Sequence, residues 1–173
     1  MNELLDILKY ILPSLVVFVA VYFVLISFLE NDSKKRIMEI KLANQKTITP
    51  IRLQAYERIV LFLERISPNN LILRVSRKEY NAFQLQSSLI KTIRGEFEHN
   101  LSQQLYISTP AWEIVKKTKE DIIKLINTAA ASVNDDANAN ELAKKIIEMN
   151  FKNNKAIVFP AIEFIKKEVT HIF

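Results

Sequence analysis

The chain has 173 residues, a formal net charge of +5 and no cysteine, so its residues offer no disulfides, thiolate metal sites or cysteine nucleophiles. Its single glycine, Gly95, argues against tight hairpins, dinucleotide-binding turns and phosphate loops, because these depend on the positive φ angles of glycine. We therefore expect an all-α fold.

The first predicted element is a transmembrane helix. The twenty residues Tyr10–Leu29 carry no charge, and at about 1.5 Å per residue they span the hydrocarbon thickness of a bilayer. A buried core helix usually has a shorter apolar run, and no small-residue cleavage site follows Leu29. We expect residues 1–30 to form a retained N-terminal anchor.

The flanking charges predict the orientation of this anchor. Only Lys9 precedes it, whereas five cations follow it closely: Lys34, Lys35, Arg36, Lys41 and Lys46. The positive-inside rule then predicts a single-pass protein of the inner (cytoplasmic) membrane, with the N-terminus outside and the C-terminal domain in the cytoplasm. Lys34, Lys35 and Arg36 are expected to contact anionic lipid headgroups.

Residues 31–48 form a basic juxtamembrane stalk. Its sequence allows two conformations, a helix that continues the anchor or a segment that lies in the membrane interface. Residues 49–173 form the predicted cytoplasmic domain, a bundle of about four to five helices. Residues 31–173 carry a net charge of +7, against −2 for residues 1–30.

The first helix of this domain is predicted to begin at Thr49-Pro50, because a hydroxyl cap followed by proline is typical of a helix start. Its broad apolar face suits a globular bundle. The helix is predicted to end at Ser67-Pro68, and Leu71–Val75 is predicted to be a short connection.

A long helix is predicted to follow, from the capping-box pattern Ser76–Glu79 to about Tyr106. Gly95 within it is expected to allow close approach of another helix. The predicted core stripe of this helix is Phe83, Ile90, Ile93, Phe97, Leu101 and Leu105.

Thr109-Pro110 predicts the start of a third helix, whose core stripe runs from Ala111 to Ala129. Residues 134–140 predict a loop in which Asp135 and Asp136 form turns or caps. Two shorter helices are predicted at about 140–151 and 155–172. Pro160 marks either a kink or a late start in the second of them.

Two Glu-x-x-His sequences, Glu96–His99 and Glu168–His171, contain the only histidines. Ferritin-like di-iron bundles use this motif on two helices, with one glutamate from each of two others. The candidate partners are Glu57, Glu64, Glu113 and Glu120. However, at 100° per residue both histidines lie opposite the apolar stripes of their helices, so we predict that they face solvent.

Other chemistry has weaker support. The Asp136-x-Asn138-x-Asn140 pattern resembles the start of a calcium loop, but Glu141 and Ile147 replace the glycine and the bidentate glutamate that such a loop needs. Four basic clusters leave nucleic-acid binding as an alternative, although they match no known reading motif. These clusters are Arg74/Arg77/Lys78, Lys116/Lys117/Lys119, Lys144/Lys145 and Lys166/Lys167. Trp112 is predicted to be a core or partner-contact residue.

Three stretches resemble an uncharacterised bacterial family of small membrane proteins. They are Leu53–Arg74 (LQAYERIVLFLERISPNNLILR), Lys91–Ile107 (KTIRGEFEHNLSQQLYI) and Trp112–Ala129. The resemblance implies one N-terminal transmembrane helix and a helical cytoplasmic part. It implies no activity, ligand or catalytic residue.

We therefore expect a non-enzymatic scaffold, adaptor or accessory subunit of a membrane complex. It is expected to recruit a protein partner, or to form a homo-oligomer, at the inner face of the membrane. The predicted contact face lies around Phe151–Phe173, where apolar residues are dense. No catalytic, cofactor-binding or metal-binding residue is assigned. The alternatives are a ferritin-like metal enzyme that uses the Glu-x-x-His pairs and a membrane-tethered nucleic-acid-binding protein.

Overall fold

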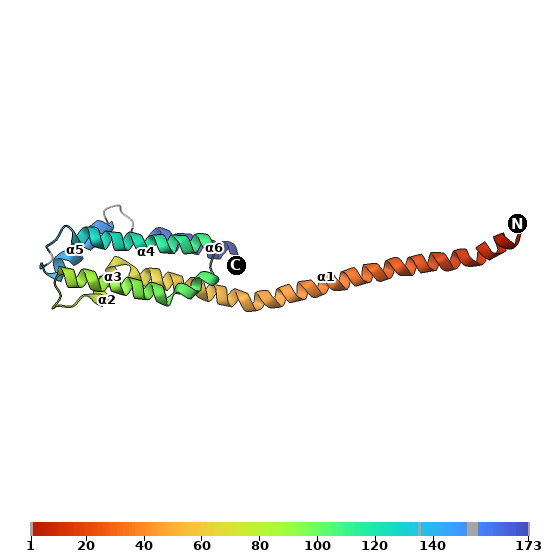
Figure 1. Ribbon diagram of the computed structural model, residues 1–173, viewed down its shortest axis with the longest axis horizontal. Helices are drawn as coiled ribbons and strands as arrows, with labels where there is room; N and C mark the ends of the chain where they lie inside the picture. The colour runs from red at the N-terminus through yellow and green to blue at the C-terminus, as the bar shows by residue number, and fades with distance from the viewer. Residues whose placement is uncertain (1, 135, 152–155, 173) are drawn as a thin grey trace. The chain divides into compact units, whose positions relative to one another are not determined.

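The computed structural model describes residues 2–134, 136–151 and 156–172, and it confirms the all-α prediction (Figure 1). The helices are α1 (Asn2–Ile66), α2 (Pro68–Val75), α3 (Ala82–His99), α4 (Thr109–Ala130), α5 (Ala139–Phe151) and α6 (Phe159–Ile172), with a 3-10 helix η1 (Leu101–Leu105). The chain forms two compact units, residues 1–48 and residues 49–173, which are described separately.

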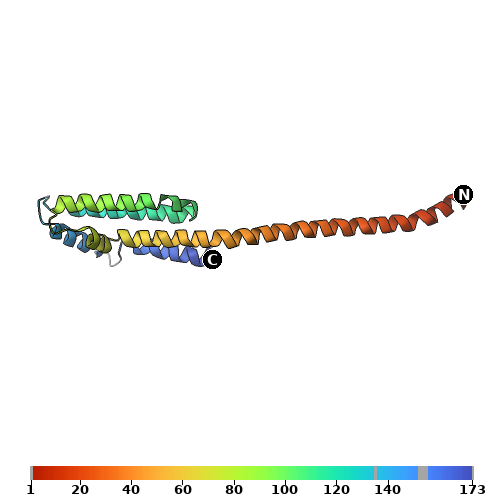
Figure 2. The same ribbon diagram turned by 90° about the horizontal axis from the view of Figure 1, so that it is seen from below.

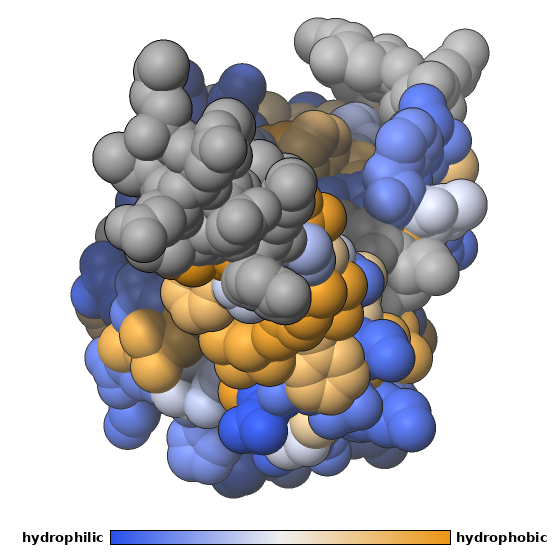
Figure 3. Space-filling model, turned by 90° about the vertical axis from the view of Figure 1, so that its right-hand side faces the viewer, coloured by the Kyte–Doolittle hydropathy of each residue, from blue (hydrophilic) through white to orange (hydrophobic). Residues whose placement is uncertain are grey.

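The first unit is the N-terminal part of α1. Between Ile11 and Leu29, every large apolar side chain that the structure describes is exposed. By length and composition, α1 contains one stretch from Pro13 onward that is long and apolar enough to cross a membrane. Figure 3 shows hydrophobic side chains on the surface of the face drawn there.

The stalk, residues 31–48, is helical. Of the two predicted conformations, the structure therefore has the one that continues the N-terminal helix. Arg36 Nε donates to Asp32 Oδ2 at 2.9 Å, one turn away on the same helix. Such a pair adds a small stabilisation to an exposed helix.

The predicted helix start at Thr49-Pro50 is wrong, because α1 continues through both residues. A proline inside a helix removes the hydrogen bond to the carbonyl four residues earlier, and its ring also crowds that carbonyl. Here that carbonyl belongs to Lys46. The helix nevertheless continues on both sides of Pro50, from Asn2 to Ile66. The predicted end of the helix at Ser67-Pro68 is confirmed.

In the second unit, the C-terminal part of α1 lies alongside α3, α4 and α6, and consecutive members of this set run in opposite directions (Figures 1 and 2). The short helices α2 and α5 lie at one end of the bundle. One continuous core fills the space between the helices. Its largest fully buried side chains include Tyr56, Phe62, Leu63, Leu85, Leu89, Ile122 and Leu142.

The predicted connection Leu71–Val75 is wrong, because these residues belong to helix α2. Pro68 occupies its first turn, where the missing N–H would have no partner in the helix. Leu71 and Ile72 are buried in the core. A segment that looks like an apolar linker in sequence is therefore a helix stabilised by packing.

Helix α3 begins later than Ser76–Glu79 predicts. Its capping residue is Asn81, whose Oδ1 accepts from the Gln84 N–H at 2.9 Å, while Gln84 Oε1 accepts from the Asn81 N–H at 3.2 Å. The helix ends at His99, short of the predicted Tyr106, and η1 follows.

The predicted core stripe of α3 is partly wrong. Ile93 is buried and Phe97 packs against the core, but Phe83, Leu101 and Leu105 are 57%, 39% and 77% exposed. The buried face consists of Ala82, Leu85, Leu89 and Ile93.

Gly95 does not mark a close approach of helices, contrary to the prediction. A Cβ atom built at Gly95 would have no heavy atom within 4 Å beyond its own local backbone. The position faces open space, so no packing contact requires glycine there.

The C-terminal half follows the prediction more closely. Helix α4 begins at Thr109, with Ser108 as its cap, and its predicted core stripe is buried or half-buried. In the loop after α4, Asn134 and Asn138 accept the local backbone hydrogen bonds, whereas Asp135 lies outside the described residues. Pro160 is the second residue of α6, so it marks a late start.

Candidate functional site

An open apolar groove runs along α1 and α6 within the second unit, with a volume of about 550 Å³. We call it the α1–α6 groove. Its lining residues from α1 are Leu53, Tyr56, Glu57, Val60 and Leu61, and those from α6 are Ile165, Lys166, Val169 and Thr170.

The lining follows from the helical periodicity of the two elements. On α1, Tyr56 faces the core, while Leu53 and Leu61 lie beside that face and remain 47% and 53% exposed. On α6, Ile165 is buried and Val169 is half-buried. The groove therefore combines an apolar floor with exposed leucines.

Two opposite charges accompany this apolar lining. Glu57 and Lys166 are both exposed and line the groove from α1 and α6 respectively. An apolar surface with polar groups at its edge is the usual composition of a protein-binding site.

A partly buried hydrogen-bonded pair connects the two helices of the groove. The Tyr56 hydroxyl donates to Glu168 Oε1 at 2.8 Å and accepts from the Ser108 N–H at 3.2 Å. Burial raises the pKa of the Tyr56 hydroxyl above its ordinary value, and the neighbouring Glu168 carboxylate adds to this effect. The pair joins α6 to α1 and to the residue that caps α4.

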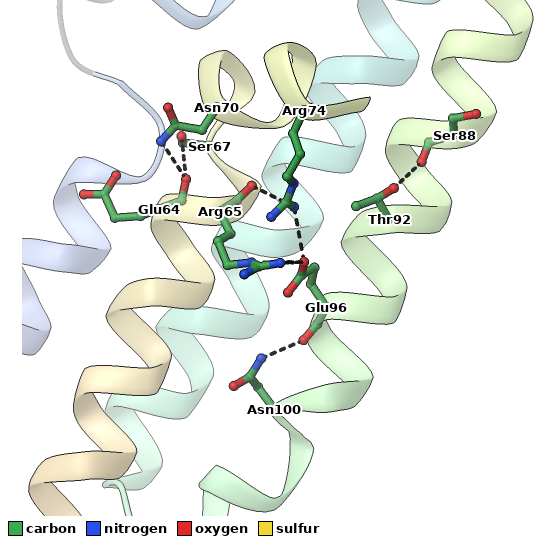
Figure 4. A network of polar contacts seen from close by, with 9 residues as sticks. All are labelled: Glu64, Arg65, Ser67, Asn70, Arg74, Ser88, Thr92, Glu96 and Asn100. Carbon is green, nitrogen blue, oxygen red and sulfur yellow. Dashed lines mark hydrogen bonds and ion pairs between the residues drawn. The ribbon is translucent and has the colours of Figure 1, made fainter. Parts of the chain in front are cut away.

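Glu96 forms a second polar centre, at the junction of α1, α2 and α3 (Figure 4). Its Oε1 accepts from Arg65 Nη2 at 2.7 Å and from Arg65 Nε at 3.0 Å, and Arg74 Nη2 lies 3.2 Å away. Nearby, the side chains of Ser67 and Asn70 donate to the Glu64 carbonyl. The contacts of Glu96 hold the C-terminal ends of α1 and α2 against α3, and those of Ser67 and Asn70 join the end of α1 to the start of α2.

The structure does not bring the residues of the Glu-x-x-His motifs together. His99 and His171 are both exposed, which confirms the prediction from helical geometry. Glu96 is bonded to arginines and Glu168 to a tyrosine. The four candidate partner glutamates, Glu57, Glu64, Glu113 and Glu120, are all exposed. In the described ranges, no three histidine or acidic side chains are grouped so that they could hold a metal ion.

Several residues of the basic clusters are paired with acidic groups. Arg74 contacts Glu96, and three lysines lie near glutamates of their own helices: Lys116 with Glu113 at 2.6 Å, Lys119 with Glu120 at 2.8 Å and Lys145 with Glu148 at 3.7 Å. Three of the four clusters therefore belong to mixed-charge surfaces.

Trp112 belongs to the core, which was one of the two roles predicted for it. It is buried and stacks on Phe97 with ring centroids 5.3 Å apart. Lys119 Nζ lies 4.2 Å from the centroid of the same Phe97 ring. The indole is therefore unavailable as a platform for stacking bases.

Sequence reasoning found only one wall of the groove. Ile165 and Val169 lie within the predicted contact face Phe151–Phe173, whereas the wall from α1 was missed. The signal was present, because Leu53 and Leu61 are apolar residues beyond those needed for the core face of α1.

Comparison with known proteins gives a family and no function. The model of a family described as a "family of unknown function (DUF7935)" matches residues 2–172. No curated protein and no solved structure matches the chain.

Proposed function

Because the chain belongs to that family of unknown function, its role must be argued from its own geometry, and we propose that it is a membrane-anchored, non-enzymatic scaffold or adaptor. In this proposal, residues 1–30 hold the protein in the inner membrane, and the helical bundle recruits a protein partner on the cytoplasmic side. The exposed apolar stretch of α1 is the observation on which the proposal depends most.

The support for the anchor is physical. Burying apolar surface is favourable by roughly 25 cal/mol per Å². The second unit has its own core. None of the described residues among residues 1–30 belongs to that core. A bilayer would cover the apolar side chains of Tyr10–Leu29, and the cations from Lys34 onward favour the cytoplasmic side.

The stalk supports attachment to anionic lipid. Lys34, Lys35 and Arg36 follow the apolar stretch after four intervening residues and are exposed. Each cation close to an anionic leaflet contributes about 1 kcal/mol of attraction. Arg36 also pairs with Asp32, which reduces its share of that attraction.

The α1–α6 groove supports partner binding. We propose that its occupant is an amphipathic helix of another protein, which lays its apolar face between Leu53, Leu61 and Val169. Recognition of this kind uses apolar anchors spaced one helical turn apart. Glu57 and Lys166 would select a partner whose polar flanks carry the complementary charges.

Cysteine labelling tests the anchor and its orientation. Single-cysteine variants Asn2→Cys and Ser102→Cys would be treated in intact cells with a membrane-impermeant maleimide. We expect labelling of Asn2→Cys alone, and labelling of Ser102→Cys only after permeabilisation. Recovery of the chain in the soluble fraction, or labelling of Ser102→Cys in intact cells, would contradict the proposal.

Affinity capture from native membranes tests the groove. We expect a stoichiometric protein partner with the wild-type chain, loss of that partner with Leu61→Glu, and its retention with Leu73→Glu. Leu73 is the matched control, because it is an exposed leucine on α2, outside the groove. Isolation of the wild-type chain alone under crosslinking would count against partner recruitment.

A further inference from the structure

Helix α1 contains an eleven-residue repeat that continues from the apolar stretch through the stalk. Isoleucines recur at this spacing at Ile26, Ile37, Ile48 and Ile59. Three residues after each isoleucine the chain again has an apolar residue: Leu29, Ile40, Ile51 and Phe62. Four residues further on it has Ser33, Asn44, Ala55 and Ile66. The spacing is 3, 4 and 4 residues throughout.

This spacing keeps the repeated residues on one face of the helix. Eleven residues over three turns give about 3.67 residues per turn, close to the 3.6 of an α-helix. A stripe with this period is typical of helices that pack side by side over long distances.

The same repeat is covered at its C-terminal end and uncovered in the stalk. Ala55, Ile59, Phe62 and Ile66 are all buried in the bundle core. In the stalk, Ile37, Ile40 and Ile48 are 55%, 61% and 51% exposed, and Asn44 between them is also exposed. We call Ile37, Ile40, Asn44 and Ile48 the stalk stripe.

We infer that the stalk stripe packs against the stalk stripe of a second copy of this chain, in parallel and in register. This inference rests on the proposed membrane anchor, because insertion of identical spans in the same direction places identical stalks at the same height. The contact would then continue into the apolar stretch through Ser33, Leu29 and Ile26. From Ile26 to Ile48 it would extend over about 33 Å of helix.

Asn44 is the feature that favours an identical partner. A polar side chain in an apolar seam is costly unless it is hydrogen-bonded, and an asparagine on the partner helix can both donate to it and accept from it. A single asparagine in such a seam fixes register and oligomeric state in paired helices. A copy of the chain aligned in parallel supplies this partner at the required position.

Disulfide crosslinking of the full chain in its native membrane tests the inference. The chain has no cysteine of its own, so single-cysteine variants have no background. A disulfide forms only where two Cα atoms come within about 7 Å. We expect Ile37→Cys, Ile40→Cys and Ile48→Cys to give several-fold more dimer on mild oxidation than Glu39→Cys and Lys46→Cys on the opposite face.

A second set of variants tests the apolar contact itself. In the Ile37→Cys background, Ile40→Glu combined with Ile48→Glu should abolish the crosslink. Met38→Glu combined with Leu42→Glu should preserve it, because Met38 and Leu42 are exposed apolar residues of the stalk that lie off the stripe. Equal crosslinking on both faces, or a crosslink that survives the Ile40→Glu and Ile48→Glu changes, would overturn the inference.

Membrane fractionation of the same samples separates the two proposals. If the chain is in the membrane pellet and the stalk stripe gives no crosslink, the inference is wrong and the anchor stands. If the chain is soluble but the stripe still crosslinks specifically, the anchor is wrong and self-association stands. A soluble chain without the crosslink would contradict both.

Discussion

At the level of single residues, the Tyr56–Glu168 pair is the most informative contact. A carboxylate and a phenol lose hydration in this interface, and hydrogen bonds between them and from the Ser108 N–H offset part of that loss, although Glu168 Oε2 has no partner among the described residues. The pair therefore contributes to the choice of one register between α1 and α6, because other registers would leave these groups without hydrogen bonds.

Replacement of Tyr56 should weaken the bundle. In Tyr56→Phe, Glu168 and the Ser108 N–H each lose a hydrogen-bond partner, so we expect the free energy of unfolding to fall by about 1–3 kcal/mol. Urea denaturation in mild detergent would measure this change. Tyr106→Phe is the control, because the Tyr106 side chain is exposed. Equal stability of the two variants would show that the pair adds nothing.

The same hydroxyl predicts a dependence of stability on alkaline pH. Its folded-state pKa is raised, so its contribution to stability is fully present below the ordinary tyrosine pKa of about 10. That contribution is lost as the pH rises through the folded-state pKa. We expect the wild type to lose stability above about pH 10 more steeply than Tyr56→Phe. Parallel losses in the two proteins would contradict this assignment.

Gly95 is a position at which a substitution should stabilise the protein. Because no neighbouring atom would meet an added Cβ, Gly95→Ala should stabilise α3 by up to about 1 kcal/mol through its higher helix propensity. Thermal unfolding would measure the gain, with Lys91→Ala at another exposed position of α3 as the control. A loss of stability would show that glycine has a packing role at this position.

At the level of helices, the sequence prediction and the structure differ in which side chains of α3 are buried. Leu89 is fully buried, and Phe83, a member of the predicted stripe, is exposed. Leu89→Ala should therefore reduce the free energy of unfolding by about 2–5 kcal/mol, because it leaves a cavity. Phe83→Ala should change it by no more than about 0.5 kcal/mol. A larger loss of stability in Phe83→Ala than in Leu89→Ala would contradict the observed register and support the predicted stripe.

The helix boundaries that were predicted correctly have local causes. Ser67-Pro68 ends α1, and Ser108, Thr109 and Pro110 begin α4, because caps and prolines act on their immediate neighbours. The start of α3 combines a local capping box, formed by Asn81 and Gln84, with a contact to distant residues. The Ala82 N–H donates to the Ala137 carbonyl at 2.8 Å, and this contact is invisible in the local sequence.

The candidate site was less predictable than the helices. Helical periodicity placed the histidines on the surface correctly, since the direction of a side chain depends only on its own helix. Leu53 and Leu61 are visible on α1 as apolar residues outside its core face, but α1 alone does not show that α6 lies beside them, because that adjacency is set by packing. Glu168 likewise gave no local sign that it bonds to Tyr56, 112 residues earlier.

At the level of the whole molecule, the two units should differ in what they need to stay folded. Every buried apolar residue of the described chain lies at Ala55 or later. We therefore expect a fragment of residues 49–173 to be soluble without detergent and to unfold cooperatively. Circular dichroism on heating would measure this transition. Aggregation, or a gradual loss of helix, would show that the bundle needs the N-terminal unit.

The separation between the two walls of the α1–α6 groove also has a consequence for biosynthesis. The ribosome makes the apolar stretch of α1 first, whereas Ile165 and Val169 emerge more than a hundred residues later. If the apolar stretch is the anchor that we propose, it can therefore be recognised while the second wall is still untranslated. Under the same proposal, a nascent chain stalled before α6 would reach the membrane without a complete α1–α6 groove.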